Sequence, residues 1–331
     1  MAAVADALTT YAHHCDSNFN IAEINVNSLN SGILESTPTP PTPSTPPGSP
    51  TAFYSGGTTS VVSEPLHFRH LQEKTLRFFP LSSGKKNCYS IPTPSPARFY
   101  LRTFTVYDNF AGSSHSPSFD VSVEGTLVFS FRSPWPLSVS RSGAYSDLFF
   151  HHSDSTADLC FCSVATDSPL VSSIELTRID DNAYPFNYDR NSSNYILINY
   201  DRFSSGSDQW GPGFTNDSDV FGRSWLSESE FMLKSIDVSV TRAGQRVFDV
   251  LVNGETVKRV DVYKEVGGFA AYDFSFVVRN LSATALTVRL EPVAGAPVIC
   301  GLENYAIVPV DLRTAPDQGK IKIIGGSLNN N

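Results

Sequence analysis

Residues 98–135 read RFYLRTFTVYDNFAGSSHSPSFDVSVEGTLVFSFRSPW, and this stretch decides the fold. Over 99–106, aromatic and β-branched side chains alternate with Leu and Thr, which is the period of two typical of a strand. Residues 107–112 (YDNFAG) break the pattern with Asp, Asn and Gly, as a turn does. The alternation resumes at 119–123 (FDVSV) and turns again at Glu124-Gly125. The stretch therefore predicts two strands joined by a loop with two aromatic rings and a carboxylate at its mouth.

The rest of the chain has the same character. Its 331 residues are 40% hydrophobic and 12% aromatic, with 23 Phe and 13 Tyr against 2 Met, which favours an all-β fold. No segment shows convincing helical periodicity, and Ser, Asp, Gly and Pro separate short strand-like runs. We expect further strands at 145–151, 157–165, 171–179, 195–203, 236–240, 247–252, 257–263, 272–278, 286–290 and 305–308. This spacing is typical of a β-sandwich or jelly roll.

Composition also excludes some functions. The net charge is −9 and no basic block is present, so nucleic-acid binding, which needs clustered Lys and Arg, is excluded. The five cysteines fit no zinc spacing, and their odd number leaves at least one unpaired. Cys160 and Cys162 fall on one face of a predicted strand, and we interpret them as small core residues. His151 and His152 would point to opposite faces of a strand, so we expect no metal site with Asp154.

Signals for the cell compartment point in different directions. Asn191, Asn216 and Asn280 each begin an acceptor pattern for N-glycosylation, which favours a secretory origin. The N-terminus lacks the basic and apolar regions of a signal peptide, and no apolar run is long enough to cross a bilayer.

Two short motifs recur along the chain. FDVSVEG at 119–125 matches FDVLVNG at 248–254, and PLVSSIE at 169–175 matches PVICGLE at 297–303. Their separations are nearly equal (169 − 119 = 50; 297 − 248 = 49). We infer two copies of one β-module.

These copies set the predicted domain organisation. We expect a first module at 75–183, a second at 195–312 and a disordered tail at 313–331. Residues 1–74 hold the tract TPTPPTPSTPPGSP, which predicts a disordered arm. The second FDV motif lacks an aromatic strand before it, so we expect the second module to be incomplete, with strands missing just before Lys234.

The longer motifs resemble the malectin-like extracellular domain of plants. The resemblance covers Leu76 to Gln318 and is most specific in the subgroup that joins tandem malectin modules to leucine-rich repeats. The segments that carry it are RTFTVYDNFAG (102–112), SDQWGPGFTNDSDVFGRSW (207–225), DVYKEVGGFAAYDFSFVVRN (261–280) and APVICGLENYAIVP (296–309). It implies two jelly-roll β-sandwiches in a glycoprotein of the secretory pathway, plasma membrane or extracellular space. Leucine-rich repeats should follow Asp317, but GKIKIIGGSLNNN follows, so we expect a shortened product.

The resemblance also implies a sugar site in the first module. Tyr107 matches the first of two aromatics that close a strand in animal malectin, and Asp108 stands where the second would be. Asp167 matches the malectin aspartate, Phe110 could replace the missing ring, and Gly295 takes the aspartate position in the second module. We therefore predict a non-catalytic, cofactor-free protein that binds a glucose-containing or cell-wall oligosaccharide. The alternatives are an ectodomain that binds a secreted peptide or receptor partner, and a truncated product without independent function.

Overall fold

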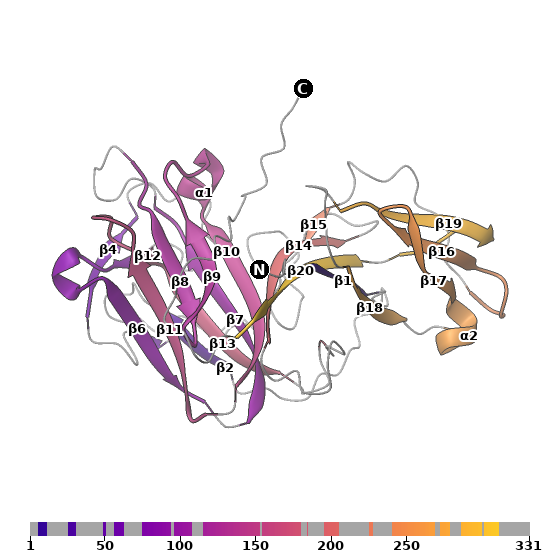
Figure 1. The fold of residues 1–331 in the computed structure, drawn as a ribbon, viewed down its shortest axis with the longest axis horizontal. Helices are drawn as coiled ribbons and strands as arrows, with labels where there is room; N and C mark the ends of the chain where they lie inside the picture. The colour runs from indigo at the N-terminus through magenta and orange to yellow at the C-terminus, as the bar shows by residue number, and fades with distance from the viewer. Residues whose placement is uncertain are drawn as a thin grey trace. The chain divides into compact units, whose positions relative to one another are not determined.

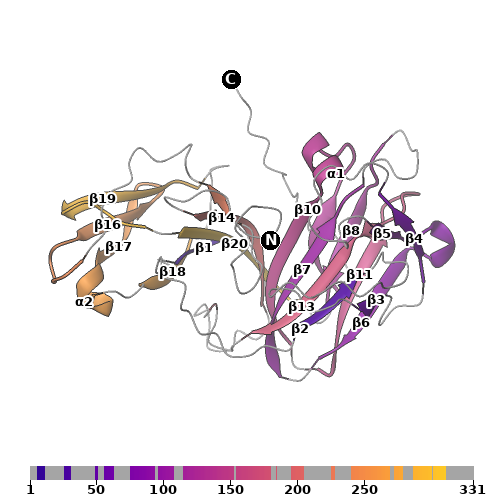
Figure 2. The same ribbon diagram turned by 180° about the vertical axis from the view of Figure 1, so that it is seen from behind.

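The structure is a computed structural model of the chain. It describes residues 6–11, 26–30, 49–50, 56–62, 75–93, 96–107, 115–152, 154–179, 184, 195–204, 225–227, 240–268, 272–278, 286–299 and 301–310. The chain divides into two compact units, which we describe separately. The A unit comprises residues 22–198 and 308–331, and the B unit comprises 1–21 and 199–307. Both are built mainly of strands, so the predicted all-β fold class is confirmed (Figures 1 and 2).

Two facing layers of strands form the A unit (Figures 1 and 2). One layer is a four-stranded antiparallel sheet in the order β6-β11-β8-β9. The other layer has the strand order β10-β7-β13-β2-β3. A further three-stranded sheet, in the order β12-β5-β4, is linked to this layer along the chain, because β13 directly follows β12. The strands are β2 (Val26–Asn30), β3 (Ser49–Pro50), β4 (Thr58–Val61), β5 (Thr75–Phe78), β6 (Lys86–Pro92), β7 (Ala97–Thr105), β8 (Phe119–Val123), β9 (Thr126–Phe131), β10 (Ala144–His152), β11 (Thr156–Ser163), β12 (Leu170–Val171) and β13 (Ser173–Ile179).

Alternation along these strands builds the core of the A unit. Phe119, Val121 and Val123 on β8 are buried, while Asp120 between them is partly exposed. The Phe161 ring of β11 lies 6.2 Å from the Tyr89 ring of β6 and 5.5 Å from Phe79. The four-stranded sheet therefore has an apolar inner face and a polar outer face, as its period of two predicts.

Three β-strands form one sheet of the B unit, in the order β17-β16-β19. Phe248, Val250 and Val260 form its buried cluster, and the half-buried rings of Tyr272, just before β18, and Phe274, within β18, pack against it. β1 pairs with β18 and β20. The strands are β1 (Asp6–Tyr11), β15 (Leu226–Ser227), β16 (Val247–Val252), β17 (Glu255–Asp261), β18 (Asp273–Val277) and β19 (Val288–Ala294); the division between the units falls within β14 (Tyr195–Ser204) and β20 (Gly301–Pro309).

Short helical segments are the main departure from the expected strands. The structure forms α1 (Leu137–Ser142), α2 (Val262–Val266) and a 3₁₀ turn η2 (Leu81–Ser83). The strand predicted at 257–263 ends at Asp261, because the Asp261 carboxylate accepts a hydrogen bond from the Lys264 N–H and caps α2. Five or six residues are too short to reveal a helical period in the sequence. Gly143 ends α1 with φ +78°, and a Cβ there would lie 2.2 Å from the Phe104 ring.

Within the first 74 residues, the structure describes four short strands, β1, β2, β3 and β4, and β2 pairs with β13 in antiparallel register. Most of this segment lies outside the described residues, so the disordered arm stays a prediction. Backbone pairing at a sheet edge needs no alternating apolar pattern, so the sequence gives little sign of these strands. The tail at 313–331 and the segment before Lys234 lie outside the described residues, so the missing strands of the second module stay a prediction.

Candidate functional site

Tyr107, the first predicted sugar ligand, lies at one end of the A unit, just after β7. Its side chain is only 4% exposed. The Tyr107 ring meets the Trp135 ring edge-on at a centroid distance of 6.0 Å. The backbone N–H of Tyr107 donates to the Ser140 carbonyl at 3.3 Å. We call the end of the A unit that carries Tyr107, Trp135, Asp167 and residues 115–118 the rim. The Tyr107 ring packs beneath this rim rather than presenting a face to solvent.

Trp135 fastens the neighbouring segment 115–118 to the same rim. Its backbone N–H donates to Ser116 Oγ at 2.8 Å, and its indole Nε1–H donates to the Pro117 carbonyl at 2.9 Å. Both bonds are buried, so they hold the segment without competition from water.

Asp167 approaches segment 115–118 from the turn between β11 and β12. Its Oδ2 accepts the Ser118 N–H at 2.8 Å, and its Oδ1 lies 3.2 Å from His115 Nε2. Burial alone would raise the pKa of the Asp167 carboxyl, but the Ser118 N–H and His115 outweigh it, and the pKa is lowered. The Asp167 side chain is 20% exposed and that of His115 is 54% exposed, so both reach solvent.

The structure thus connects Tyr107 and Asp167 to the same segment from two sides. Asp108 and Phe110 lie outside the described residues. Sequence reasoning missed Trp135, Ser118 and His115. Trp135 closes the stretch that decides the fold, but nothing in its spacing shows that its indole bonds back to Pro117.

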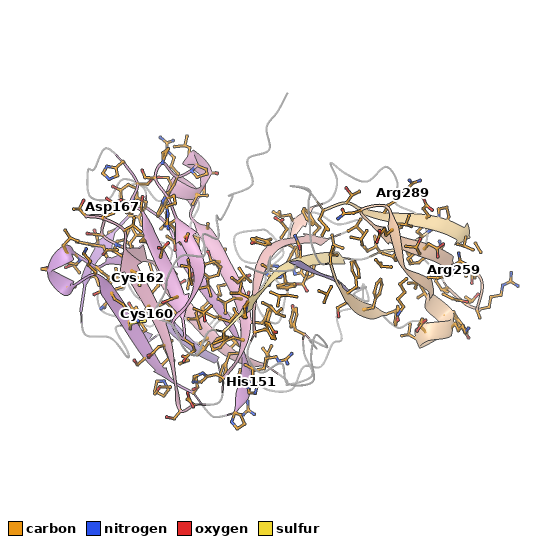
Figure 3. The ribbon with its side chains drawn as sticks, in the orientation of Figure 1. His151, Cys160, Cys162, Asp167, Arg259 and Arg289 are labelled. Atoms are coloured by element: carbon orange, nitrogen blue, oxygen red, sulfur yellow. A yellow bond between two sulfur atoms is a disulfide. The ribbon has the colours of Figure 1, made fainter. Side chains whose placement is uncertain are left out.

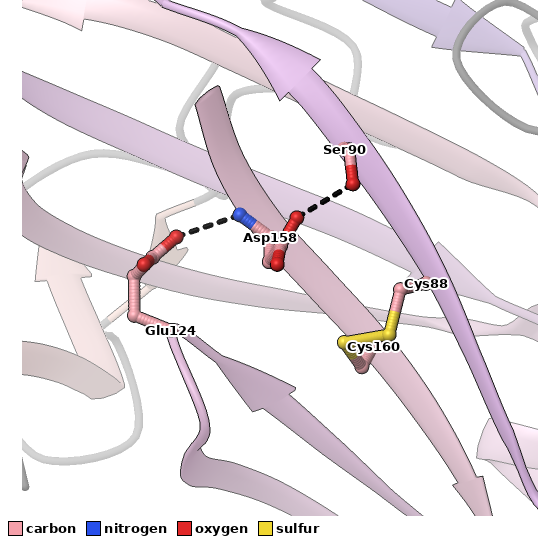
Figure 4. The surroundings of a disulfide bond; sticks show 5 residues. All are labelled: Cys88, Ser90, Glu124, Asp158 and Cys160. Carbon is pink, nitrogen blue, oxygen red and sulfur yellow. Dashed lines mark hydrogen bonds between the residues drawn. A yellow bond between two sulfur atoms is a disulfide. The ribbon is translucent and has the colours of Figure 1, made fainter. Parts of the chain in front are cut away.

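One disulfide joins two neighbouring strands of the four-stranded sheet, β6 and β11 (Figure 4). Cys88 on β6 and Cys160 on β11 are directly opposed in register and bonded to each other. Cys160 is 2% exposed, as expected of a core residue, and it is in addition a disulfide partner, which the sequence did not predict. Cys162 follows on the same face as a half-buried free thiol, and burial raises its pKa.

The histidines considered beside Asp154 as metal ligands, His151 and His152, lie at the end of β10. His152 is buried with Nε2 2.8 Å from the Thr156 carbonyl, and His151 is half-buried. In Figure 3, His151 and Asp167 lie at opposite ends of the A unit. Within the described ranges, no group of three or more His, Cys, Asp and Glu side chains could hold a metal ion. Asn191, Asn216 and Asn280, the glycosylation candidates, lie outside the described residues.

Buried ion pairs brace the strands of both units. In the A unit, Arg102 donates to both oxygens of Asp147 at 2.8 and 2.9 Å. Burial disfavours the Arg102 cation, but the Asp147 carboxylate more than compensates, and the pKa of Arg102 is raised. In the B unit, Arg202 Nε donates to Glu303 at 2.5 Å. Each pair joins an arginine to a carboxylate on the neighbouring strand of its sheet, so we interpret both pairs as structural.

Comparison with known proteins identifies the family. A family model described as "Malectin-like domain" matches residues 49–242, more than half of the chain. Receptor-like protein 4 of Arabidopsis thaliana is 27% identical over 333 residues, which cover 80% of this chain and 52% of that protein. The chain thus spans about half the length of this relative.

Solved structures share the fold. The plant receptor-like kinase FER has a TM-score of 0.68 at 15% identity, with 89% of this chain and 100% of that chain covered. A chain of the crystal structure of plant peptide RALF23 in complex with FER and LLG2 has a TM-score of 0.65 at 14% identity, with 88% of this chain and 96% of that chain covered. Within the described residues, no helix combines the length and apolarity that a membrane span requires.

Proposed function

We propose that this chain, which belongs to the malectin-like domain family, is a non-catalytic carbohydrate-binding module of the plant secretory pathway or cell surface. The rim of the A unit supports this proposal, because the segment 115–118 links the supporting Tyr107 to the solvent-reaching Asp167 and His115 there. The ligand class we propose is a glucose-containing or cell-wall oligosaccharide.

Each rim residue has a distinct role in this proposal. The Asp167 carboxylate and the His115 imidazole would bind sugar hydroxyls, since charge-assisted hydrogen bonds are stronger than neutral ones. Phe110 would supply the ring that covers a sugar face, with Asp108 as a second acceptor. Tyr107 would act as a positioning residue through Trp135, because its own ring is buried.

A secretory location has independent support from the Cys88–Cys160 disulfide, because disulfides persist in oxidising compartments. We accordingly propose that Asn191, Asn216 and Asn280 carry N-glycans. A leucine-rich-repeat segment in the full-length product and an association with the membrane belong to the same proposal.

Titration calorimetry with gluco-oligosaccharides on the full chain tests the carbohydrate proposal. We expect weak binding that Asp167→Ala and Phe110→Ala each reduce, because a shallow rim excludes little water. Asp249→Ala is the matched control, since Asp249 is an aspartate of the B unit paired with Arg259. Absence of binding by the wild type, or equal binding by all four proteins, would reject the carbohydrate site.

A second candidate function is recognition of a secreted peptide or receptor partner. The burial of the Tyr107 ring favours it, because a ring without a free face cannot stack on a sugar. Likeness to a chain of the RALF23, FER and LLG2 complex, which contains a peptide, also supports it. A glycan array run beside a panel of secreted plant peptides separates the two functions. A melt without a cooperative transition would instead favour the truncated product without independent function.

A further inference from the structure

One sheet of the B unit has three strands where its counterpart in the A unit has four. Both sheets contain an FDV motif, so β16 corresponds to β8, β17 to β9 and β19 to β11. In the A unit, β6 pairs with the other side of β11 and ends that sheet. Among the described strands, none takes this place beside β19, which lies at one edge of its sheet (Figure 1). β19 therefore offers a free strand edge.

The hydrogen bonds just before β19 show which of its backbone groups face this free edge. The Thr287 N–H donates to Asn253 Oδ1 at 3.0 Å, and the Thr287 carbonyl accepts the Asn253 N–H at 2.9 Å. Both backbone groups of Thr287 therefore face β16. Because backbone direction alternates along an antiparallel strand, the N–H and C=O groups of Val288 and Leu290 face away from β16.

The A unit shows the same alternation at the corresponding positions. The N–H and carbonyl of Asp158 bond to Glu124 Oε1 and to the Glu124 N–H on the β8 side, at 2.6 and 3.0 Å. An odd number of residues further along, the Ser163 N–H donates at 2.8 Å to the Lys85 carbonyl, just before β6. Asp158 corresponds to Thr287. The groups that β11 directs to β6 are therefore those that β19 leaves at its free edge.

The side chains along the free edge are self-complementary. On one face of β19, the side chains of Arg289 and Glu291 are 71% and 41% exposed, and Arg289 Nη2 lies 3.1 Å from Glu291 Oε1. On the other face, Val288 and Leu290 are half-buried and pack against the buried cluster of the sheet. Opposite charges thus flank Leu290. A second copy of the strand, antiparallel and centred on Leu290, would place each arginine opposite a glutamate.

We propose that two copies of this chain associate through β19, with a two-fold axis at Leu290, into one continuous antiparallel sheet. The Leu290 N–H of each copy donates to the Leu290 carbonyl of the other copy, and the Val288 N–H donates to the Pro292 carbonyl of the other copy. Arg289 of each copy faces Glu291 of the other copy. Opposite charges on directly opposed residues stabilise paired strands, so the charge pattern selects this register.

Two features keep the association from spreading into a fibre. Pro292 has no N–H, so the ladder between the copies ends at its pairing with Val288. The other edge of the sheet, β17, has an extra residue, Val257, between Thr256 and Lys258, where its register with β16 shifts. Such a bulge disfavours the addition of a strand. One usable edge in each copy gives a closed two-fold dimer.

Sedimentation equilibrium of the full chain over a range of concentrations tests the dimer. Arg289→Glu places like charges opposite each other twice, so the association constant should fall by about tenfold or more. Arg178→Glu is the matched control, because it makes the same charge change at an exposed position on β13 of the A unit. It should associate like the wild type. Thermal melting of each dilute variant checks that it is folded.

Mixing two variants provides a rescue that a folding defect cannot imitate. Glu291→Arg alone should associate as weakly as Arg289→Glu, because it also opposes like charges. A mixture of the two variants should form a heterodimer about as tight as the wild-type dimer, since every opposed pair again has opposite charges. Failure of the mixture to associate, or equal association of the wild type and Arg289→Glu, would overturn the proposal.

Amide hydrogen exchange at Leu290 reads the edge directly. In the wild type, exchange of the Leu290 amide should slow as the protein concentration rises, because its N–H becomes bonded in the dimer. The Thr287 amide is bonded within the B unit and should not respond. A chain that stays monomeric at all concentrations would contradict the proposal. So would a Leu290 amide that is already protected in the monomer, because another segment of the same chain would then occupy the edge.

Discussion

Two hairpins, 119–131 in the A unit and 247–261 in the B unit, grow from the same motif. Phe119 and Phe248 are buried at 0% and 4% exposure, and each motif strand lies between two antiparallel neighbours. The aspartate after each phenylalanine pairs with an arginine: Asp120 with Arg132, which directly follows β9, and Asp249 with Arg259 on β17. A short local sequence thus specifies strand, turn and outward ion pair twice.

What surrounds the hairpins differs. In the A unit, β11 also pairs with β6, to which the disulfide joins it. In the described part of the B unit, β19 pairs with β16 alone. At the rim, Asp167 binds the N–H of Ser118, while Gly295 takes that place in the B unit. A Cβ on Gly295 would lie 2.4 Å from the Gln245 carbonyl oxygen, and its φ is +65°, so a side chain is excluded there. The FDV motif thus specifies the hairpin, while the strands and residues around the hairpin determine which cross-links and hydrogen bonds it makes.

Replacing Phe119 or Phe248 with alanine should give the largest difference in stability between the two hairpins. Phe119 packs between Phe131 at 4.6 Å, Trp135 at 6.0 Å and Phe161 at 6.5 Å, so Phe119→Ala should cost about 3–5 kcal/mol. Phe248 packs on half-buried neighbours, which can close around a cavity, so Phe248→Ala should cost about 3 kcal/mol or less. Urea unfolding followed by amide hydrogen exchange assigns each loss to its unit. Equal losses would mean that the two cores are equally well packed.

The sequence predicted the parts of the molecule that depend on neighbours along the chain. The FDV repeat, the alternation of β8 and the turn at Glu124 follow from local pattern. The contact between Glu124 and His152, the Cys88–Cys160 bond and the hydrogen bond from Ser118 to Asp167 each join residues far apart in sequence. Only the register of the sheet brings them together, so a single sequence cannot reveal them. The same holds for Tyr107, whose burial depends on Trp135.

Removing the disulfide should have an intermediate effect, confined to the A unit. The bond joins residues 72 apart in sequence, so its loss in the double variant Cys88→Ser and Cys160→Ser should cost about 2–4 kcal/mol. Thermal melting with and without a reducing agent measures it. The reductant should lower the wild-type midpoint and leave the double variant unchanged.

Cys162→Ser is the control for that experiment, because Cys162 lies on the same face of β11 but forms no disulfide. It should retain the wild-type response to reductant. Loss of the response in Cys162→Ser, or a transition of the B unit that shifts with that of the A unit, would contradict the assignment of the disulfide to the A unit alone.

The smallest expected effect concerns Asp167 in the A unit, whose counterpart in the B unit is Gly295. The folded-state pKa of Asp167 lies below its ordinary value of 3.8, so the carboxylate stabilises the A unit above that pH and stops doing so as the pH falls through the lowered value. Asp167→Asn should therefore cost less than about 1 kcal/mol at pH 6, because the carboxylate is partly exposed, and this cost should shrink as the pH falls below 3.8. Hydrogen exchange at the Ser118 amide reads the change locally, since that N–H donates to Asp167 Oδ2. The B unit has Gly295 at this place and nothing to titrate, so the amides of its hairpin should respond identically in the wild type and the variant. A loss that does not diminish as the pH is lowered below 3.8 would show that Asp167 stabilises the rim through its shape rather than its charge.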